Sequence, residues 1–188
     1  MATNIEEGIN ICISQSNNSS TRFCSSPSVV TVAQKLIAEV IGTYFIIFAG
    51  CGSVAVNKLY NGSITFPGIC VTWGLIVMVM IYSLGHVSGA HFNPAVTITF
   101  TIFRRFSWKL IGHLGGLAIG MTIILNVFVA GPISGASMNP ARSIGPAIVK
   151  QVYKGLWVYI VGPLIGTVAG AFVYNLIRST DKPISSTS

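Results

Sequence analysis

One eight-residue motif occurs twice in this chain, as Ser88-Gly-Ala-His-Phe-Asn-Pro-Ala95 and as Ser134-Gly-Ala-Ser-Met-Asn-Pro-Ala141. The two copies are identical at six of eight positions and lie 46 residues apart. Asn is a favoured N-cap residue, and Pro suits the first position of a helix because the N–H that it lacks would have no partner there. Each copy therefore predicts a loop that ends where a helix begins.

The apolar segments behind the motifs are short. Asn93–Phe103 and Asn139–Val149 have 11 residues each, which is about 16 Å of helix and half of a hydrocarbon core of about 30 Å. Two half-membrane helices in a duplicated setting are typical of membrane proteins whose discontinuous helices meet at the bilayer midplane.

The composition predicts an all-α integral membrane protein. Charged residues make up 8% of the chain, hydrophobic residues make up 52%, and the mean hydropathy is +0.72, so there is too little charge to cover a soluble globule. Helices buried inside a large soluble protein are the alternative, but 188 residues cannot supply the surface that would cover them. Four segments are long enough to span a bilayer: Leu36–Val56, Gly68–Val87, Leu114–Gly131 and Leu156–Ile177.

The net charge of +7 orients the chain and gives no reason to expect a nucleic-acid partner. With a cytosolic N-terminus, most basic residues fall on the cytosolic side, as the positive-inside rule requires. They are Arg22, Lys35, Arg104, Arg105, Lys109, Arg178 and Lys182, whereas the opposite side holds Lys58, Lys150 and Lys154. We therefore expect a transmembrane domain over residues 32–178, between disordered cytosolic tails at 1–31 and 179–188 that carry no signal peptide.

Residues that carry enzyme chemistry are scarce. The chain has four acidic residues, no set of nucleophile and base, and no phosphate-binding loop. Its four cysteines show no C-x-x-C spacing, and no His/Glu cluster indicates a metal. We expect neither enzyme activity nor a cofactor.

The topology makes the two motifs an inverted repeat. The first half-helix enters from the cytosolic side and the second from the opposite side, so both N-termini, with their partial positive charge, point at the midplane. Irregular backbone survives at that depth only where it is buried or lines a water-filled cavity. We expect the carbonyls of Gly89–His91 and Gly135–Ser137 to line a pore, with the amides of Asn93 and Asn139 as donors at its centre.

Such a lining fits water and small uncharged solutes, which exchange hydrogen bonds one at a time, whereas a cation meets two positive helix ends and Arg142. Arg142 stands three residues after Asn139, with no acidic residue near it in the sequence. A charged residue inside a membrane segment is a candidate for function. Snorkelling of its side chain to the outer interface is the alternative.

These residues resemble the major intrinsic protein (aquaporin) family, whose hallmark is the doubled Asn-Pro-Ala motif, here Asn93-Pro94-Ala95 and Asn139-Pro140-Ala141. The chain is most similar to the nodulin-like intrinsic proteins of plants, also through Ala38-Glu-Val-Ile-Gly-Thr-Tyr44 and Tyr174-Asn-Leu-Ile-Arg178. The resemblance implies a channel in a plasma or internal membrane that passively carries water and neutral solutes such as glycerol or ammonia. It also implies a homo- or hetero-oligomer, a tetramer in the family.

The resemblance further implies a constriction near the outer mouth of the pore, formed by Trp73, Val127, Ala136 and Arg142. Trp, Val and Ala would leave it apolar and fairly wide, which suits glycerol-like solutes. Taken without the resemblance, Trp73 and Val127 are better explained by packing against lipid or other helices.

Three further features receive structural roles. The resemblance implies that Glu39 supports the loop of the second motif by accepting backbone hydrogen bonds, and a buried carboxylate needs donors in any case. His91 either lines the cytosolic vestibule or packs as a satisfied histidine. The G-x-x-x-G-x-x-x-G pattern of Gly162, Gly166 and Gly170 predicts a face for close helix packing.

The repeat also reveals a departure from the family, whose members have six spans. Leu114–Gly131 resembles the fifth family span, so the third and fourth are missing at about Lys109–Leu110. Their loss preserves the orientation of the later segments but removes two walls of the pore and the second-repeat counterpart of Glu39. We expect an aquaporin-like inverted repeat truncated to four spanning helices. Two functions stay open: an aquaporin-type channel, and a non-conducting truncated isoform that associates with full-length aquaporins.

Overall fold

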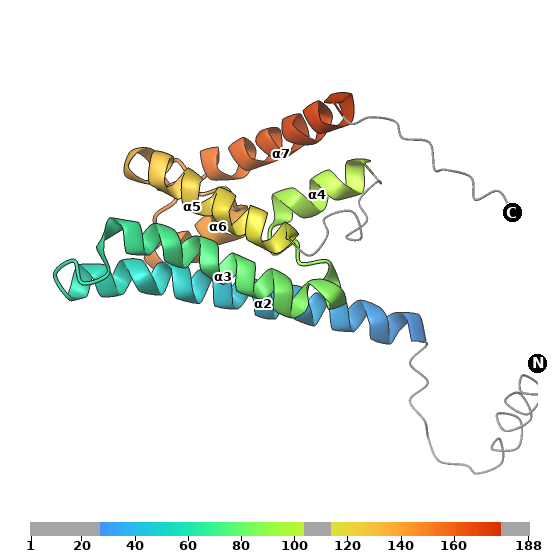
Figure 1. Ribbon diagram of the computed structural model, residues 1–188, viewed down its shortest axis with the longest axis horizontal. Helices are drawn as coiled ribbons and strands as arrows, with labels where there is room; N and C mark the ends of the chain where they lie inside the picture. The colour runs from blue at the N-terminus through green and yellow to red at the C-terminus, as the bar shows by residue number, and fades with distance from the viewer. Residues whose placement is uncertain (1–26, 104–113, 178–188) are drawn as a thin grey trace, which may run out of the picture. The chain divides into compact units, whose positions relative to one another are not determined.

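The computed structural model describes residues 27–103 and 114–177, and these residues form six α-helices (Figure 1). Four of the helices are long and apolar enough to cross a membrane. They are α2 (Pro27–Leu59), α3 (Thr65–Ser88), α5 (Gly115–Ser134) and α7 (Val158–Ile177), and between them lie the short helices α4 (Pro94–Phe103) and α6 (Pro140–Lys150). The prediction of an all-helical fold with four spanning segments is confirmed.

The first helix begins earlier than its apolar span. α2 starts at Pro27, whereas the apolar pattern predicts a start at Leu36, so the last residues of the predicted disordered tail are helical. The physical reason is that no Gly or Pro interrupts the chain between Pro27 and Leu36, and Pro is well placed at the first turn of a helix. The rest of both tails and the basic segment Arg104–Lys109 lie outside the described residues.

Both short helices begin at the proline of a motif, as predicted. The side chain of Asn139 caps α6 by accepting a hydrogen bond from the N–H of Ala141, 3.0 Å away. The Oδ1 atom of Asn93 accepts the equivalent bond from the N–H of Ala95, also 3.0 Å away. The same residues in the same pattern thus start both half-helices.

The loops ahead of the two motifs begin with a similar backbone. α3 and α5 end at Gly89 (φ 96°) and Gly135 (φ 75°), both left-handed residues whose N–H groups bond back into the helix. A left-handed glycine is a common helix terminator because glycine has no Cβ to collide with the backbone. Ala90 and Ala136 come next, with φ of 47° and 48°. The sequence repeat is therefore also a structural repeat.

The two helices that lead into the motifs, α3 and α5, pack closely through a pair of glycines. A Cβ atom on Gly74 would lie 2.4 Å from the carbonyl oxygen of Gly120, and one on Gly120 would lie 2.8 Å from that of Gly74. Small residues allow this approach of backbones between membrane helices. Because Gly74 and Gly120 are themselves 46 residues apart, this contact lies where the two repeats meet.

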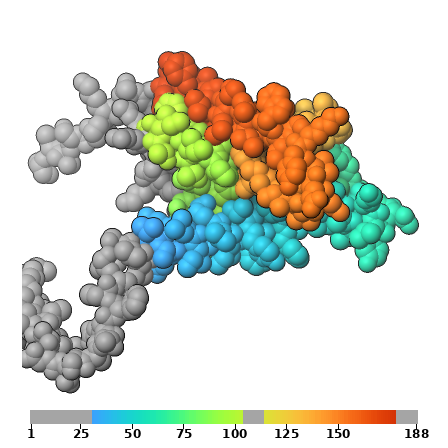
Figure 2. All heavy atoms as spheres, turned by 180° about the vertical axis from the view of Figure 1, so that it is seen from behind, coloured from blue at the N-terminus to red at the C-terminus, as the bar shows by residue number. Residues whose placement is uncertain are grey.

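α7 lies beside the first half-helix (Figure 2). Thr99 of α4 is buried and donates a hydrogen bond of 2.7 Å to the hydroxyl of Thr167 in α7. Nothing in the part of the chain that the structure describes packs against the glycine face predicted for α7. A Cβ on Gly162, Gly166 or Gly170 would meet no atom within 4 Å, since none of the described helices lies against that face.

Candidate functional site

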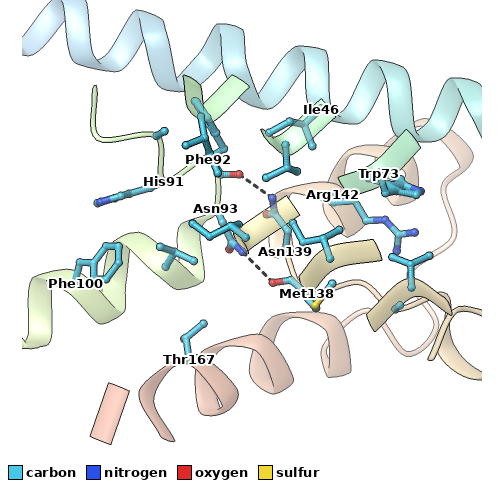
Figure 3. Close-up of a pocket in the computed structure, with 18 residues that line it drawn as sticks. Ile46, Trp73, His91, Phe92, Asn93, Phe100, Met138, Asn139, Arg142 and Thr167 are labelled. Atoms are coloured by element: carbon cyan, nitrogen blue, oxygen red, sulfur yellow. Dashed lines mark hydrogen bonds between the residues drawn. The ribbon is translucent and has the colours of Figure 1, made fainter. Parts of the chain in front are cut away.

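The N-termini of α4 and α6 meet through two reciprocal hydrogen bonds (Figure 3). The side-chain amide of Asn93 donates to the backbone carbonyl of Met138 at 2.9 Å, and the amide of Asn139 donates to the carbonyl of Phe92 at 2.7 Å. Each asparagine therefore reaches across to the residue that precedes the other. The two motifs are brought together about an approximate two-fold axis, as the inverted repeat predicts.

These bonds leave donor capacity at the centre of the site. An amide NH2 group has two N–H donors, and each asparagine uses one of them on the opposite carbonyl. Its oxygen is engaged by the alanine N–H of its own motif. The orientation of both side chains is thus fixed, and one N–H on each has no acceptor among the described residues.

Both asparagines line a cavity of about 320 Å³. Its wall is mostly apolar and comes from both repeats, with Asn93, Asn139, His91, Thr167 and Arg142 as its polar side chains. A largely apolar cavity with a few fixed polar groups is suited to small polar solutes that carry no charge. His91 lines this cavity, and its Nδ1 atom lies 3.1 Å from the hydroxyl of Thr97, so its ring has a hydrogen-bond partner within the chain.

The four side chains predicted for the constriction, Trp73, Val127, Ala136 and Arg142, all line the same cavity. Trp73 is 6% exposed and Val127 is 7% exposed, so neither packs against lipid. The guanidinium carbon of Arg142 lies 4.8 Å from the centre of the Trp73 ring, within the range of a cation–π interaction. This contact, seen in Figure 3, places the guanidinium of Arg142 beside the Trp73 ring at the wall of the cavity.

A second cavity of about 420 Å³ lies on the other side of this pair. It is lined by Trp73 and Arg142 together with Cys51, Lys154 and Tyr159, among others. Trp73 and Arg142 are therefore shared by the two cavities. Any path that joins the two cavities therefore passes this pair of side chains.

Sequence reasoning missed the residue that makes room for Trp73. A Cβ atom on Gly50 of α2 would lie 2.4 Å from three atoms of the indole ring, so only glycine fits at this position. The sequence shows Gly50-Cys-Gly52 in the first span, but nothing in that pattern says which glycine faces a tryptophan. Gly52 has open space where its Cβ would be.

We predict that Gly50→Ala displaces the Trp73 ring and destabilises the folded chain by about 1–3 kcal/mol, the usual cost of overpacking. Gly52→Ala is the matched control, because both variants gain the same methyl group on the same helix. The midpoint of thermal unfolding in detergent and the tryptophan fluorescence spectrum measure the two effects. Equal midpoints and equal spectra for the two variants would show that Trp73 is not held against Gly50.

Glu39 supports the first loop, so the expectation that it supports the second loop is wrong. Its carboxylate accepts hydrogen bonds from the hydroxyl of Ser88 at 2.7 Å and from the N–H groups of His91 at 3.0 Å and Phe92 at 2.6 Å. The physical reason is depth. Glu39 lies in the first half of α2, on the side from which the first loop enters the bundle, and the second loop enters from the other side.

Comparison with known proteins agrees with the doubled motif. A family model described as major intrinsic protein matches residues 26–111 and 108–174. The chain is 56% identical over 246 positions to the probable NIP-type aquaporin of Nicotiana alata, covering 96% of this chain and 90% of that protein. It is 53% identical over 230 positions to the putative aquaporin NIP4-1 of Arabidopsis thaliana, covering 87% and 81%. It is 38% identical over 250 positions to nodulin-26 of Glycine max, covering 97% and 92%.

The same comparisons also concern the prediction that two spans are missing inside the chain. The alignment with the Nicotiana alata protein runs over 246 positions although this chain has 188 residues in all, so a segment of that protein has no counterpart here. The two matches to the family model meet at residues 108–111, where the sequence predicts the junction Lys109–Leu110. Both findings agree with a shortened relative of these proteins.

Proposed function

The chain belongs to the major intrinsic protein family, and we propose that the path through its two cavities carries water and small uncharged solutes, such as glycerol or ammonia, passively across a membrane. The observation that carries the proposal is the pair of reciprocal Asn–carbonyl bonds beside a cavity that ends at Trp73 and Arg142. One free N–H on each asparagine offers a solute hydrogen bonds at the centre. The apolar wall accepts the C–H groups of a polyol.

Charged solutes are disfavoured by the same arrangement. The N-termini of α4 and α6 converge at the asparagines, so their partial positive charges add. Arg142 contributes a full charge close by, and none of the described residues that line either cavity is acidic. The site thus opposes cations while leaving neutral molecules a continuous set of donors.

The predicted loss of two spans, which removes part of the wall of the path, favours a second role. In this role the isolated chain does not conduct and instead associates with full-length aquaporins. Osmotic shrinkage of vesicles that hold only this chain separates the two roles. We expect a water permeability equal to that of empty vesicles, because loop backbone next to a missing wall is not closed off from lipid. A permeability above that of empty vesicles, abolished by Asn139→Leu, would instead assign conduction to the chain alone.

Conduction itself is tested in what we term the completed chain. In this variant, the segment of the Nicotiana alata protein that has no counterpart here is inserted between Lys109 and Leu110. The insertion is designed to restore the two spans that the repeat lacks. Because it removes no residue of this chain, every residue of the proposed path is kept. An oligomer, with a tetramer as the family's usual form, is the assembly that we propose for it.

We propose that both termini are cytosolic, and surface labelling tests this orientation. Lys150 and Lys154 are exposed and should react with a membrane-impermeant amine reagent added to intact cells. Lys35, exposed at the other end of the first span, should react only after the cells are permeabilised. The reverse pattern of labelling would invert the topology.

A further inference from the structure

The two loops that carry the same motif are in different environments. Ser88 and Gly89 of the first loop are half-buried, whereas their counterparts Ser134 and Gly135 are exposed. Glu39 accepts bonds from the first loop, but among the described residues the N–H groups of Ser137 and Met138 have no acceptor. The second loop therefore lacks both the cover and the carboxylate that the first loop has.

The backbone φ angles of the two loops also differ. Phe92, whose N–H bonds to Glu39, is held at a left-handed φ of 47°. Its counterpart Met138 has a negative φ. A bulky residue adopts the left-handed region only when its surroundings impose it. Phe92, which bonds to the carboxylate, is held in that region, and Met138, which has no such bond, is not.

The half-helix behind the second loop contacts α7 and α4, but among the described residues no helix covers its face that corresponds to the buried face of α4. On α4, Ala95 is 0% exposed and Thr99 is 4% exposed, because α7 packs there. The counterparts on α6 are Ala141, which is half-buried, and Gly145, where a Cβ atom would meet nothing within 4 Å. We call this surface the uncovered face; it consists of Ser134, Gly135, Ser137, Met138, Ala141 and Gly145.

We propose that the uncovered face binds membrane-spanning helices of another polypeptide, and that a carboxylate on one of them accepts hydrogen bonds from the N–H groups of Ser137 and Met138, as Glu39 of α2 does in the first repeat, where α7 covers the half-helix. Lipid tails carry no acceptor, so they leave backbone donors at that depth unpaired. A carboxylate can accept both bonds at once, as Glu39 does in the first loop. The small residues of the face let a helix approach closely.

A second copy of this chain does not fit the role. Glu39 is the one acidic residue in the part of the chain that the structure describes, and it already accepts three bonds from its own first loop. The other acidic residues, Glu6, Glu7 and Asp181, belong to the predicted tails. The partner must therefore bring a carboxylate of its own to mid-membrane depth. The inference rests on the proposed function only in placing the loops at that depth.

Photo-crosslinking tests the proposal with a defined partner. The probe is the segment of the Nicotiana alata protein that has no counterpart here, produced as a separate polypeptide in the same membrane as the full chain. A photoreactive amino acid at Gly145 should capture the probe. The same amino acid at Gly52, which also has open space around it, is the control and should capture at least tenfold less.

The carboxylate is tested by replacing each acidic residue of the probe with its amide. One replacement should lower the capture at Gly145 by about tenfold, the loss expected when charge-assisted bonds are replaced by neutral ones. Capture that is equal at Gly145 and Gly52, capture of a second copy of this chain instead of the probe, or capture unchanged by every amide replacement would each overturn the proposal. Because the measurement is crosslinking, its failure leaves permeation through the completed chain as a separate result.

Discussion

Glu39→Gln should destabilise the folded chain by about 3 kcal/mol, because hydrogen bonds to a charged group contribute roughly 1.5–3 kcal/mol each. The carboxylate accepts three hydrogen bonds from the first loop. Glutamine keeps one oxygen, but its NH2 group must face an N–H or hydroxyl donor of the loop. The bond to Phe92 also holds this residue at a left-handed φ, so losing it releases a strained backbone.

Lys35→Gln provides the control for this prediction. Lys35 lies one helical turn before Glu39 and is exposed, so its replacement changes a charge on α2 without touching the loop. The midpoint of thermal unfolding in detergent should fall by several degrees for Glu39→Gln and hardly at all for Lys35→Gln. If the two variants unfold at the same temperature, Glu39 does not support the first loop.

Arg142→Val in the completed chain should raise cation permeation by at least tenfold while water permeation persists. Two unit charges about 4 Å apart repel by about 4 kcal/mol at an effective dielectric constant of about 20, and each 1.36 kcal/mol is about tenfold in rate. Screening by water in the path reduces this figure. Water and other uncharged solutes do not feel the charge, so they respond mainly to the change in width.

Lys154→Val is the matched control for Arg142→Val. Lys154 also lines the second cavity but is exposed and does not line the cavity that holds the asparagines, so water screens its charge. Cation conductance and osmotic shrinkage, measured on the same vesicles, separate the effects of charge and width. Cation exclusion that is the same in both variants would mean that the helix N-termini alone form the barrier.

The sequence predicts the motif pair and the half-helices well because their causes are local. Asn at the N-cap and Pro at the first helical position determine where α4 and α6 begin, and the 46-residue repeat indicates that the two loops face each other. The lengths of the spanning helices follow from the apolar runs. The start of α2 differs most, at Pro27 instead of Leu36, and the other ends of the spanning helices differ by three residues or fewer, because an apolar run marks the membrane and not the end of helical structure.

The partner of Glu39 could not be predicted with the same reliability. Both loops carry a serine hydroxyl and two backbone N–H groups at equivalent positions, so the donors alone do not decide between them. Which loop lies level with Glu39 depends on how α2 packs against the bundle. The place of Gly50 beneath Trp73 depends on the same packing, since a glycine in a span gives no sign of the group that it faces.

The glycines of α7 show that a packing pattern does not identify its neighbour. A G-x-x-x-G pattern indicates a helix that can be approached closely, but it cannot show whether the neighbour exists. Gly162, Gly166 and Gly170 face open space among the described residues. The pattern identified a packing surface whose partner this chain does not supply.

We propose that this chain holds the residues of a path for neutral solutes and lacks two of the helices that would enclose it. Stopped-flow light scattering of vesicles that contain the completed chain tests whether this path conducts. Water and glycerol should cross these vesicles faster than empty ones, and Asn139→Leu should remove the difference because it deletes the amide at the centre of the path. Completed chains that insert and assemble, yet leave the vesicles no more permeable than empty ones, would contradict the claim.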